Sequence, residues 1–436
     1  MAKNPNDQKM ADIVSLCRRR AFIFQSSEIY GGLNGCWDYG PLGVELKKNI
    51  KNAWWNDMVT RRSDVEGVDC SILMNPRVWE ASGHVSSFTD PMVDCTQCRG
   101  RFRADHIVNR QCPTCGTKDK FTQVRHFNLM FKTFVGAMED SSSQTYLRPE
   151  TCQGIFANFD NIVSTCRVKV PFGIAQIGKA FRNEINPRNF TFRSREFEQM
   201  EMEFFCQPEE ADKWFEYWKQ FRYDWYLKYG MKKERLHLRP HAKDELAHYA
   251  AGCADIEYDF PFGRAELEGI ANRTDYDLQR HSEFSKKDLS YFDPALNKKY
   301  RPYVIEPSAG ADRATLAFLV DAYEVEAERT VLRFHPKIAP IKVAVFPLVN
   351  KDGMPELGEK LVQALKKRYP SFYDDKGAIG RRYRRQDEVG TPFCVTIDGE
   401  TLSNQTVTVR ERDSMAQSRI AIDQVASFLD DKLSGD

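Results

Sequence analysis

The spacing of apolar residues predicts two amphipathic helices in the first half of the chain. Between Val44 and Arg62 apolar side chains recur at every fourth position, which places them on one side of a helix. This stripe consists of Leu46, Ile50, Trp54 and Met58. A second stripe between Pro208 and Tyr229 consists of Trp214, Trp218, Phe221 and Trp225. Stacking on nucleic-acid bases is one interpretation of these aromatic residues, but a helix that faces the core is the stronger one.

Two predicted strands joined by a polar loop indicate a long antiparallel hairpin. The strands cover residues 175–178 and 198–205, and the loop contains residues 186–189. Beside the loop lie two arginines that can neutralise phosphate charge, a carboxylate that can accept from an adenine amino group, and a ring that can stack on a base. These residues are Arg182, Arg193, Glu184 and Phe197. The hairpin is predicted to hold a nucleotide bent for adenylate chemistry; the alternative is an ordinary hairpin with surface salt bridges.

A second segment has the features of a phosphate-binding site. Residues 306–313 lead into an apolar helix over residues 314–323. Gly310 lets the backbone approach a ligand, the helix N-terminus favours an anion, and Arg313 adds a full positive charge. Glycine before a helix is common, so this segment alone is weak evidence for phosphate binding. The evidence becomes strong because the predicted nucleotide-binding hairpin precedes it in the chain.

The order of predicted strands and helices changes beyond residues 333–340, a segment that contains two prolines. Strands are predicted at residues 341–346, 392–397 and 406–409, with a helix around residues 357–365 and a final helix over 420–433. Strands that alternate with helices indicate a small α/β domain of roughly 100 residues. We therefore expect one domain over residues 1–335 and a second over residues 336–436.

Composition narrows the class of protein. A chain of 436 residues exceeds what one hydrophobic core usually supports. The net charge is +1, so a nucleic-acid surface must be a local patch. The sequence has no apolar run of bilayer length and no signal-peptide pattern after Met1. Most of the twelve cysteines are scattered singly, so we expect a cytoplasmic protein with no membrane partner.

Four of the cysteines form two Cys-x-x-Cys pairs, which is the pattern of a structural zinc site. The four are Cys95, Cys98, Cys112 and Cys115. Four thiolates can complete a tetrahedral Zn²⁺ site and leave no position open to water, so a structural role is favoured over a catalytic one. Paired disulfides are the alternative, which conflicts with the cytoplasmic expectation. The segment from His241 to His248 also contains possible ligands, but we expect ordinary hydrogen bonds there and assign it no metal.

Acidic residues cluster near the ends of several predicted strands. The clusters lie at residues 148–151, 198–201, 266–269 and 306–308. The α-ammonium group of an amino acid needs carboxylate or carbonyl acceptors, and a pocket that must refuse every side chain can use these groups to crowd the α-carbon. Each glutamate taken singly is equally compatible with a solvated surface charge.

The hairpin and the glycine–arginine segment resemble two signature motifs of class II aminoacyl-tRNA synthetases. Residues 181–197 resemble motif 2, and residues 310–313 resemble motif 3. The resemblance implies an α+β catalytic domain in which an antiparallel sheet is flanked by helices. It also implies a zinc-bearing insertion at residues 92–122, a helical insertion at 207–250 and a C-terminal α/β anticodon-binding domain. In this family a long helix and strand at the position of residues 44–62 form the dimer interface.

Longer stretches narrow the resemblance to the glycine-specific synthetases of the homodimeric type. They are residues 30–43, 147–154, 181–201, 266–267 and 306–313. The implied activity is that of a glycine–tRNA ligase, which forms glycyl-adenylate with ATP and transfers glycine to the 3′ end of tRNA(Gly). The implied ATP-binding residues are Arg182, Asn183, Glu184, Phe192, Arg193, Ser194, Arg195, Glu196, Phe197, Glu266, Leu267, Gly310, Ala311, Asp312 and Arg313. Those implied for glycine or its adenylate are Arg103, Glu150, Phe197, Glu198, Gln199, Met200, Glu201, Glu306, Pro307, Ser308, Ala309 and Gly310.

The resemblance also implies roles for individual residues. Arg182 would bind the α-phosphate and the glycine carboxylate, while Arg193 and Arg313 would bind the γ-phosphate. Glu266 would hold part of the Mg²⁺ that accompanies ATP. Arg182, Arg313 and Glu266 are therefore the expected catalytic residues, because in-line attack on phosphorus needs positioning and charge stabilisation rather than a protein nucleophile.

A basic cluster in the C-terminal domain is the candidate tRNA contact. It consists of Arg381, Arg382, Arg384 and Arg385 around Tyr383, and Arg410, Glu411 and Arg412 could join it. Such a cluster suits phosphate contact and base stacking. A solvated helix with internal ion pairs to Asp387 and Glu388 is the alternative, and the resemblance to an anticodon-binding domain favours RNA.

Two rival functions remain open from the sequence. One is a related synthetase for threonine, serine or proline, although a hydroxyl-reading site often uses an open catalytic zinc, unlike the closed four-cysteine set. The other is a non-catalytic tRNA-binding paralogue. Such a protein would be expected to lose Arg182, Glu184, Phe197 or Arg313, and all four are present.

Overall fold

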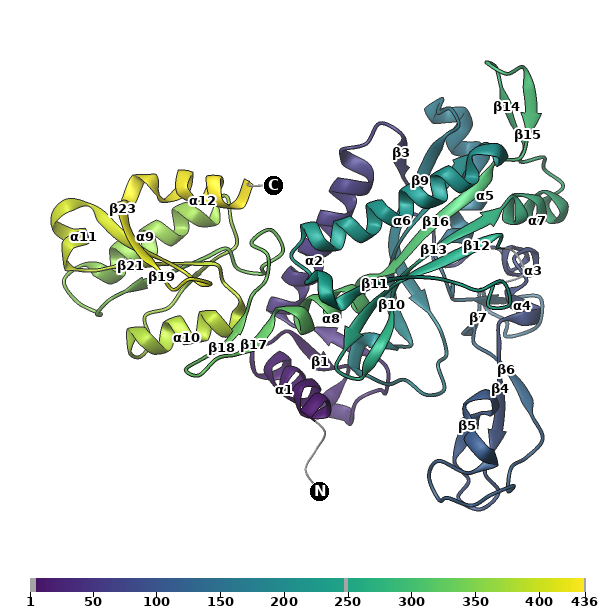
Figure 1. The fold of residues 1–436 in the computed structure, drawn as a ribbon, viewed down its shortest axis with the longest axis horizontal. Helices are drawn as coiled ribbons and strands as arrows, with labels where there is room; N and C mark the ends of the chain where they lie inside the picture. Colours follow the sequence, from purple (N-terminus) through teal and green to yellow (C-terminus); the bar gives the residue numbers. More distant parts are fainter. Residues whose placement is uncertain (1–4, 247–249, 435–436) are drawn as a thin grey trace.

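A seven-stranded sheet and a five-stranded sheet organise the two parts of the molecule (Figure 1). The computed structural model describes residues 5–246 and 250–434. Among these residues, no helix combines the length and the apolar character needed to cross a lipid bilayer. The mixture of helices and sheets is the expected α+β class.

The large sheet has the strand order β11-β12-β13-β16-β10-β9-β3, and every neighbouring pair is antiparallel except β3 and β9. Its strands are β3 (Val65–Gly67), β9 (Phe172–Phe181), β10 (Glu196–Cys206), β11 (Leu236–Pro240), β12 (Gly252–Phe260), β13 (Gly263–Thr274) and β16 (Tyr303–Gly310). The predicted hairpin is confirmed, because β9 and β10 pair from Phe181 opposite Glu196 to Phe172 opposite Phe205. Both strands are longer than predicted.

Helices cover both faces of this sheet. The elements are α1 (Pro5–Arg19), α2 (Pro41–Trp55), α5 (Cys152–Cys166), α6 (Ala211–Lys228), α7 (Tyr276–Ser285) and α8 (Ala311–Ala322). Successive strand residues face opposite sides, so Phe204 packs in the core with α2, α6 and α8, whereas Phe205 packs in the cluster of α5 and α7. The helix predicted over residues 44–62 is confirmed for most of its length: α2 begins earlier, at Pro41, whose fixed φ suits a first helical position, and it ends at Trp55, after which Asn56–Thr60 continue as a π-helical turn. Its whole predicted stripe is buried.

The aromatic helix α6 faces the core, as expected. Trp218 and Trp225 are buried, and Trp214 and Phe221 pack against the same cluster. The segment 207–250, expected to be helical, also contains β11, which pairs with β12 and extends the main sheet. The strand is short and polar on alternate positions, so it gives little apolar signal. Residues 247–249 of this segment lie outside the described residues.

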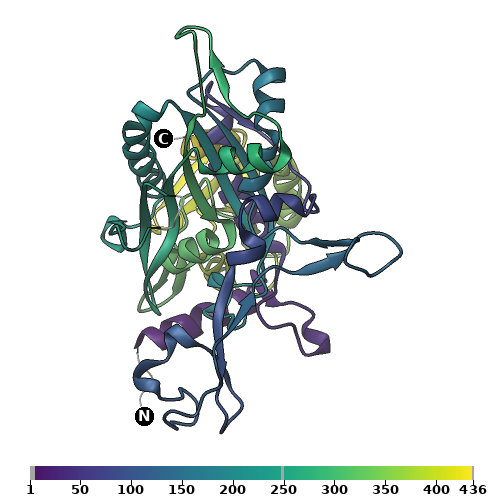
Figure 2. The same cartoon turned by 90° about the vertical axis from the view of Figure 1, so that its right-hand side faces the viewer.

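Smaller sheets and helices project from the large domain. They are β1 (Ile23–Gln25), β2 (Trp37–Tyr39), α3 (Arg77–Ala81), α4 (His84–Ser87), β4 (Thr89–Asp94), β5 (Arg101–Arg103), β6 (Arg125–Asn128), β7 (Lys132–Phe134), β8 (Gln144–Tyr146), β14 (Tyr291–Asp293), β15 (Lys298–Tyr300), β17 (Tyr323–Val325) and β18 (Thr330–Leu332). Strands β5, β4 and β6 form one arm, and the hairpin of β7 and β8 points in a different direction (Figure 2).

The C-terminal sheet has the order β20-β19-β21-β22-β23. Its elements are β19 (Val343–Pro347), α9 (Met354–Lys366), β20 (Ser371–Tyr373), α10 (Ile379–Val389), β21 (Phe393–Ile397), α11 (Gly399–Asn404), β22 (Thr406–Glu411), β23 (Gln417–Ala421) and α12 (Val425–Ser434). The prediction of a helix from residue 420 was wrong at its start, because Ile420 belongs to β23 and pairs with Val407. An exposed edge strand lacks the alternation that marks a half-buried one, so β23 was missed. The boundary expected at residue 335 lies between β18 and β19 and stays a prediction.

Buried ion pairs join the two domains. Arg329, beside β18, lies 3.2 Å from the carboxylate of Asp387 on α10 and donates to the carbonyl oxygen of Arg412 at 2.8 Å. Asp387 also accepts from Arg410 at 2.9 Å. On the rim of this joint, Arg20 lies 2.6 Å from Glu388. Helix α10 is therefore held to the large N-terminal domain along one side.

Beneath α6, the core contains a fully buried ion pair. Arg222 donates to both carboxylate oxygens of Glu268 at 2.7 and 3.1 Å, and the hydroxyl of Tyr226 donates to Glu268 at 2.8 Å. Both charged side chains are inaccessible to solvent. The charges are stable here only as a pair, because desolvating one alone is costly.

Replacing Arg222 with Met should lower the free energy of unfolding by about 3–5 kcal/mol, because Glu268 loses its countercharge inside the core. The double variant R222M/E268Q should recover much of this loss. Urea unfolding followed by circular dichroism measures both values. A single variant as stable as the wild type, or a double variant less stable than the single one, would contradict the role of the pair.

Candidate active site

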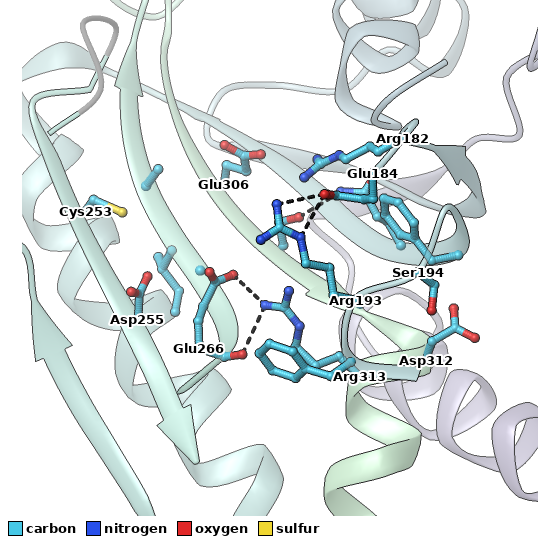
Figure 3. A pocket seen from close by; sticks show the side chains of 18 of the residues that line it. Arg182, Glu184, Arg193, Ser194, Cys253, Asp255, Glu266, Glu306, Asp312 and Arg313 are labelled. Atoms are coloured by element: carbon cyan, nitrogen blue, oxygen red, sulfur yellow. Dashed lines mark hydrogen bonds and ion pairs between the residues drawn. The ribbon is translucent and has the colours of Figure 1, made fainter. Parts of the chain in front are cut away.

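A pocket of about 690 Å³ opens on the main sheet, where β10, β12, β13 and β16 meet the hairpin loop and the start of α8 (Figure 3). Its lining consists of Arg182, Glu184, Thr191, Phe192, Arg193, Ser194, Phe197, Gln199, His241, Glu245, Ala250, Cys253, Asp255, Glu266, Gly269, Ile270, Ala271, Glu306, Ser308, Gly310, Asp312 and Arg313. The residues of both predicted motifs therefore converge on one cavity.

Two arginines of the hairpin line one side of the pocket, and contacts within the protein orient both of them. The Nε of Arg182 donates to the carbonyl oxygen of Pro149 at 3.0 Å, and its guanidinium lies 5.3 and 5.4 Å from the ring centres of Phe197 and Phe88. Arg193 contacts a carboxylate oxygen of Glu184 through Nε at 2.8 Å and through a terminal nitrogen at 2.7 Å. These contacts fix the direction of both positive charges before any ligand arrives.

A third arginine enters from the first turn of α8. Arg313 lies 3.1 Å from the carboxylate of Glu266 and also donates to the backbone carbonyl of Glu266 at 3.0 Å. Its guanidinium lies 4.4 Å from the ring centre of Phe192. An anion at this helix N-terminus would meet both the helix dipole and a full positive charge.

The start of α8 is anchored by the buried carboxylate of Asp312. One of its oxygens accepts from Tyr39 at 2.7 Å and from Lys47 at 2.8 Å, and the other accepts from the backbone amide of Glu198 at 2.7 Å. Lys47 also lies 2.6 Å from the carboxylate of Glu198. Three elements beside the pocket, namely α2, β10 and α8, are thus tied together at one point.

Carboxylates form the opposite part of the site. Glu201 accepts from the hydroxyl of Ser308 at 2.8 Å and from the amide of Thr151 at 3.2 Å. Arg273 donates to Glu306 at 2.7 Å. Burial raises the pKa of Glu306 to about 8, with Arg273 opposing the shift and Glu201 reinforcing it.

Two further glutamates lie just behind this group. Glu203 is fully buried, and among the described residues neither of its carboxylate oxygens has a hydrogen-bond partner. Burial and the nearby Glu306 raise its pKa well above the usual range. Glu150 instead lies 3.2 Å from His84 and accepts from Cys152 at 2.9 Å. Burial opposes ionisation of Glu150, but His84 and Arg273 hold its pKa well below the usual range.

The structure places only part of each implied ligand set on the pocket wall. Outside the lining are Asn183, Arg195, Glu196, Leu267 and Ala311 of the ATP set, and Arg103, Glu150, Glu198, Met200, Glu201, Pro307 and Ala309 of the glycine set. Strand alternation explains many of these positions. Met200 and Ala309 are buried in the core beneath α8, whereas Gln199 and Ser308 face the pocket.

Two of the arginines outside the pocket have structural contacts. Arg195 donates to the carbonyl oxygens of Asn34 and Glu184, at 2.7 and 2.9 Å, and so braces the hairpin loop. Arg103 lies on β5 and contacts Asp90 at 2.8 Å and Asp105 at 2.7 Å. Arg195 is therefore engaged by hydrogen bonds to the backbone and Arg103 by ion pairs, and neither side chain faces the pocket.

One wall of the pocket was not predicted. It carries His241, Glu245, Cys253 and Asp255, and the imidazole Nε2 of His241 lies 2.8 Å from the carboxylate of Asp255. The expectation of ordinary hydrogen bonds at His241 is confirmed, but its position at the pocket was missed; His248 lies outside the described residues. Cys253 and Asp255 stand two residues apart on β12, a spacing that would have placed both on one face.

The four paired cysteines converge in the arm that carries β4 and β5. Their sulfur atoms all lie within 4.8 Å of one another, with 3.8 Å between Cys95 and Cys115 and 3.6 Å between Cys98 and Cys112. A tetrahedral site with Zn–S bonds of about 2.3 Å needs sulfur atoms about 3.8 Å apart. All are free thiols rather than disulfides, so the disulfide alternative is wrong and the donor set fits zinc.

The basic cluster lies on α10 but is mostly engaged within the protein. Arg382 is buried and donates to the carbonyl oxygens of Pro347 at 2.5 Å and Gly377 at 3.1 Å. Arg385 contacts Asp374 at 2.6 Å, and Arg384 contacts Glu328 at 3.2 Å. Arg410 and Arg412 are buried as well. The expectation that Arg382 faces RNA therefore needs correction, because its donors are taken by backbone carbonyls, while Arg381 is exposed.

Comparison with known proteins gives two family matches and several close relatives. The tRNA synthetase class II core domain (G, H, P, S and T) matches residues 131–323, and the anticodon binding domain matches residues 342–432. The glycine–tRNA ligase of Treponema denticola is 58% identical over 426 residues, which is 94% of each chain. That of Caldanaerobacter subterraneus subsp. tengcongensis is 55% identical over 456 residues, covering 97% of this chain and 98% of the relative.

A third relative, the glycine–tRNA ligase of Geobacillus kaustophilus, is 54% identical over 460 residues and covers 98% of this chain. The matched length covers nearly the whole chain in each case. With more than half of its residues shared along nearly its whole length, the chain belongs to the glycine–tRNA ligases of the class II aminoacyl-tRNA synthetase family.

Proposed function

We propose that this chain forms glycyl-adenylate from glycine and ATP in the pocket described above and then passes glycine to the 3′ end of tRNA(Gly). The observation that carries the proposal is the division of charge within one cavity. Three arginines suited to phosphates stand on one side, and buried carboxylates suited to an ammonium group stand beside them. Activation of an amino acid by ATP needs both kinds of group at once.

In the first step the glycine carboxylate attacks the α-phosphorus of ATP, and pyrophosphate leaves. Arg182 would hold the attacking carboxylate and the α-phosphate together, which supplies both proximity and charge stabilisation. Arg193 and Arg313 would exchange their carboxylate partners for the γ-phosphate. Bound Mg²⁺ would neutralise phosphate charge, and the half-exposed Glu266 is the residue suited to hold it.

The ammonium group of glycine would lie against Glu306, which lines the pocket, with Glu201 behind the pocket wall and bonded to Ser308. Ser308 and Thr151 already orient Glu201, so its carboxylate cannot turn away to admit a side chain. A threonine or serine enzyme would need a free hydroxyl-reading group instead. A non-catalytic paralogue is disfavoured by the arginines, which are held ready for a ligand by Glu184 and Glu266.

We also propose that two copies of the chain form a homodimer. Ile29 and Tyr30, in the loop before α2, are 89% and 87% exposed, and Leu33 follows them. The turn of the β7–β8 hairpin contains the exposed Val135 and Met138, and this hairpin projects on the same side of the molecule as the segment between β1 and β2 (Figure 2). Apolar side chains gathered in this way favour burial against a second protein surface.

The remaining expectations concern zinc, tRNA and compartment. We propose that the cysteine cluster holds a structural Zn²⁺, which would close the arm of β4, β5 and β6.

The exposed Arg381, with the partly exposed Arg384 and Arg385, is the part of α10 available to the tRNA backbone. Twelve free thiols suit the reducing cytoplasm.

Pyrophosphate exchange into ATP, measured with glycine, alanine, serine, threonine and proline, should respond to glycine alone. Arg313→Ala should slow the glycine-dependent exchange by about 100-fold or more, because the leaving phosphates lose a positive charge. Arg264→Ala removes an exposed arginine outside the pocket and should leave the rate unchanged. Exchange with threonine or serine but not glycine would refute the substrate, and no exchange with any amino acid would favour the paralogue.

The KM for glycine should fall as pH rises from about 6.5 to about 8, by up to about tenfold per unit, and then level off. The sign follows from Glu306, whose raised pKa of about 8 keeps it protonated in the empty site at neutral pH. An ammonium group favours the carboxylate, so glycine binding releases a proton. Exchange kinetics at saturating ATP measure this dependence, and a flat profile over that range would count against the role of Glu306.

Metal analysis of the purified protein should find about one zinc per chain. Cys112→Ser should lose the metal, because a tetrahedral thiolate site loses one of its four ligands, whereas Cys166→Ser alters an exposed cysteine outside the cluster and should retain it. Protein that contains no zinc and four reactive thiols in the arm would refute the site.

A further inference from the structure

His84 lies where the arm of β4, β5 and β6 joins the large domain (Figure 1). It is the first residue of α4, and its side chain is only 12% exposed. Trp79 of α3 and Phe88, which follows α4, both contact the imidazole, with ring centres 5.6 and 5.1 Å away. The backbone is fixed as well, because Asn128 at the end of β6 donates to the carbonyl oxygen of His84 at 3.0 Å. This histidine has no part in the binding of ATP or glycine proposed above.

One edge of the imidazole reaches the acidic half of the site. Its Nε2 lies 3.2 Å from a carboxylate oxygen of Glu150, and its Nδ1 lies 2.8 Å from the hydroxyl of Ser82. A hydroxyl hydrogen from Ser82 at Nδ1 leaves the ring proton on Nε2, which is the tautomer that donates to Glu150. The other oxygen of Glu150 accepts from Cys152 and Gln153, at 2.9 and 3.1 Å. These contacts fix the carboxylate of Glu150 from both sides.

Glu150 adjoins the carboxylates that would hold the ammonium group of glycine. The sulfur of its neighbour Cys152 lies within 4.8 Å of a carboxylate oxygen of Glu201 and of Glu306. Burial opposes the ionisation of Glu150, and the contact with His84 is the strongest of the influences that nevertheless hold its pKa well below the usual range. The histidine thus keeps a negative charge beside the ammonium subsite.

The ring of Phe88 connects His84 to the basic half of the site. The guanidinium of Arg182 lies 5.4 Å from the ring centre of Phe88 and 5.3 Å from that of Phe197. Cation–π attraction favours this position of an arginine beside aromatic rings. Arg182 also donates to the carbonyl oxygen of Pro149, the residue before Glu150. A shift of Phe88 would therefore disturb the side chain that the proposed reaction needs at the α-phosphate.

We propose that His84 is a positioning residue for glycine activation, which orients Glu150 through Nε2 and supports Arg182 through the ring of Phe88. The inference rests on the proposed function, because both groups would act in the formation of glycyl-adenylate. The two contacts have different consequences. Glu150 would act on bound glycine, so loss of its donor weakens glycine binding. Arg182 would stabilise the charge that develops during attack on phosphorus, so loss of its support lowers kcat.

Two substitutions separate these contacts. His84→Phe keeps a ring against Phe88 but removes the donor to Glu150, so the KM for glycine should rise by about tenfold or more while kcat stays within about threefold of the wild type. His84→Gln keeps an amide donor near the position of Nε2 but removes the ring, so kcat should fall by about tenfold or more while the KM for glycine stays within about threefold. Glycine-dependent pyrophosphate exchange, measured over a range of glycine concentrations at saturating ATP, gives both constants.

The chain contains a matched control for the histidine–carboxylate contact. His237 on β11 lies 2.9 Å from Asp259 on β12, and neither residue lines the pocket. His237→Phe should therefore change neither constant. Phe88→Leu tests the path to Arg182 from its other end and should lower kcat as His84→Gln does. Urea unfolding followed by circular dichroism shows whether each variant keeps the fold.

Each contrary result has a distinct meaning. Wild-type values of both constants in the two His84 variants would overturn the inference and leave the proposed function intact. The same change of kcat and KM in both variants would overturn it as well, because a histidine that only supports the fold gives no such division. If the His84 variants do not fold, a normal kcat in Phe88→Leu would overturn the support of Arg182. Absence of glycine-dependent exchange in the wild type would refute the proposed function itself.

Discussion

The carboxylate of Asp312 is the point on which the geometry of the site depends. It receives hydrogen bonds from Tyr39, from Lys47 on α2 and from the backbone of Glu198 on β10. Since Arg313 is its neighbour, the same contacts decide where the third arginine stands. A buried carboxylate with three donors has little freedom to move, because turning away would break its hydrogen bonds and its ion pair with Lys47 in a low-dielectric region. One side chain thus ties together α2, β10 and the start of α8.

Successive side chains of a strand point to opposite faces of the sheet, so ligand-facing residues alternate with core residues. On β10 and β16, one face presents Gln199, Ser308 and Glu306 to the pocket, while the residues between them pack beneath α8. The same strands therefore provide both the ligand surface and the core that supports it. This arrangement explains why whole sequence motifs overstate the number of contacts, since roughly every second residue of a strand faces away.

Strong periodic signals made much of the fold predictable. The stripe of α2, the aromatic face of α6 and the β9–β10 hairpin follow from spacing alone, and the arginines of the site follow from the motifs. Weaker signals failed. Strand β11 is short, β23 is an exposed edge, and the wall of His241 depends on which strands the sheet brings together. The burial of Arg382 could not be predicted from the sequence, because its hydrogen-bond partners are backbone carbonyl oxygens, which every residue has.

The joint between the domains has a mechanical consequence. Asp387 on α10 is held by Arg410 of its own domain and by Arg329 of the catalytic domain, and Arg329 is also bonded to the backbone at Arg412. The opposite side of α10 exposes Arg381 to solvent. A force applied to α10 would therefore act on a helix that a buried ion pair holds to the catalytic domain, rather than on a loose hinge. The C-terminal domain is thus joined to the catalytic domain by a buried ion pair as well as by the chain itself.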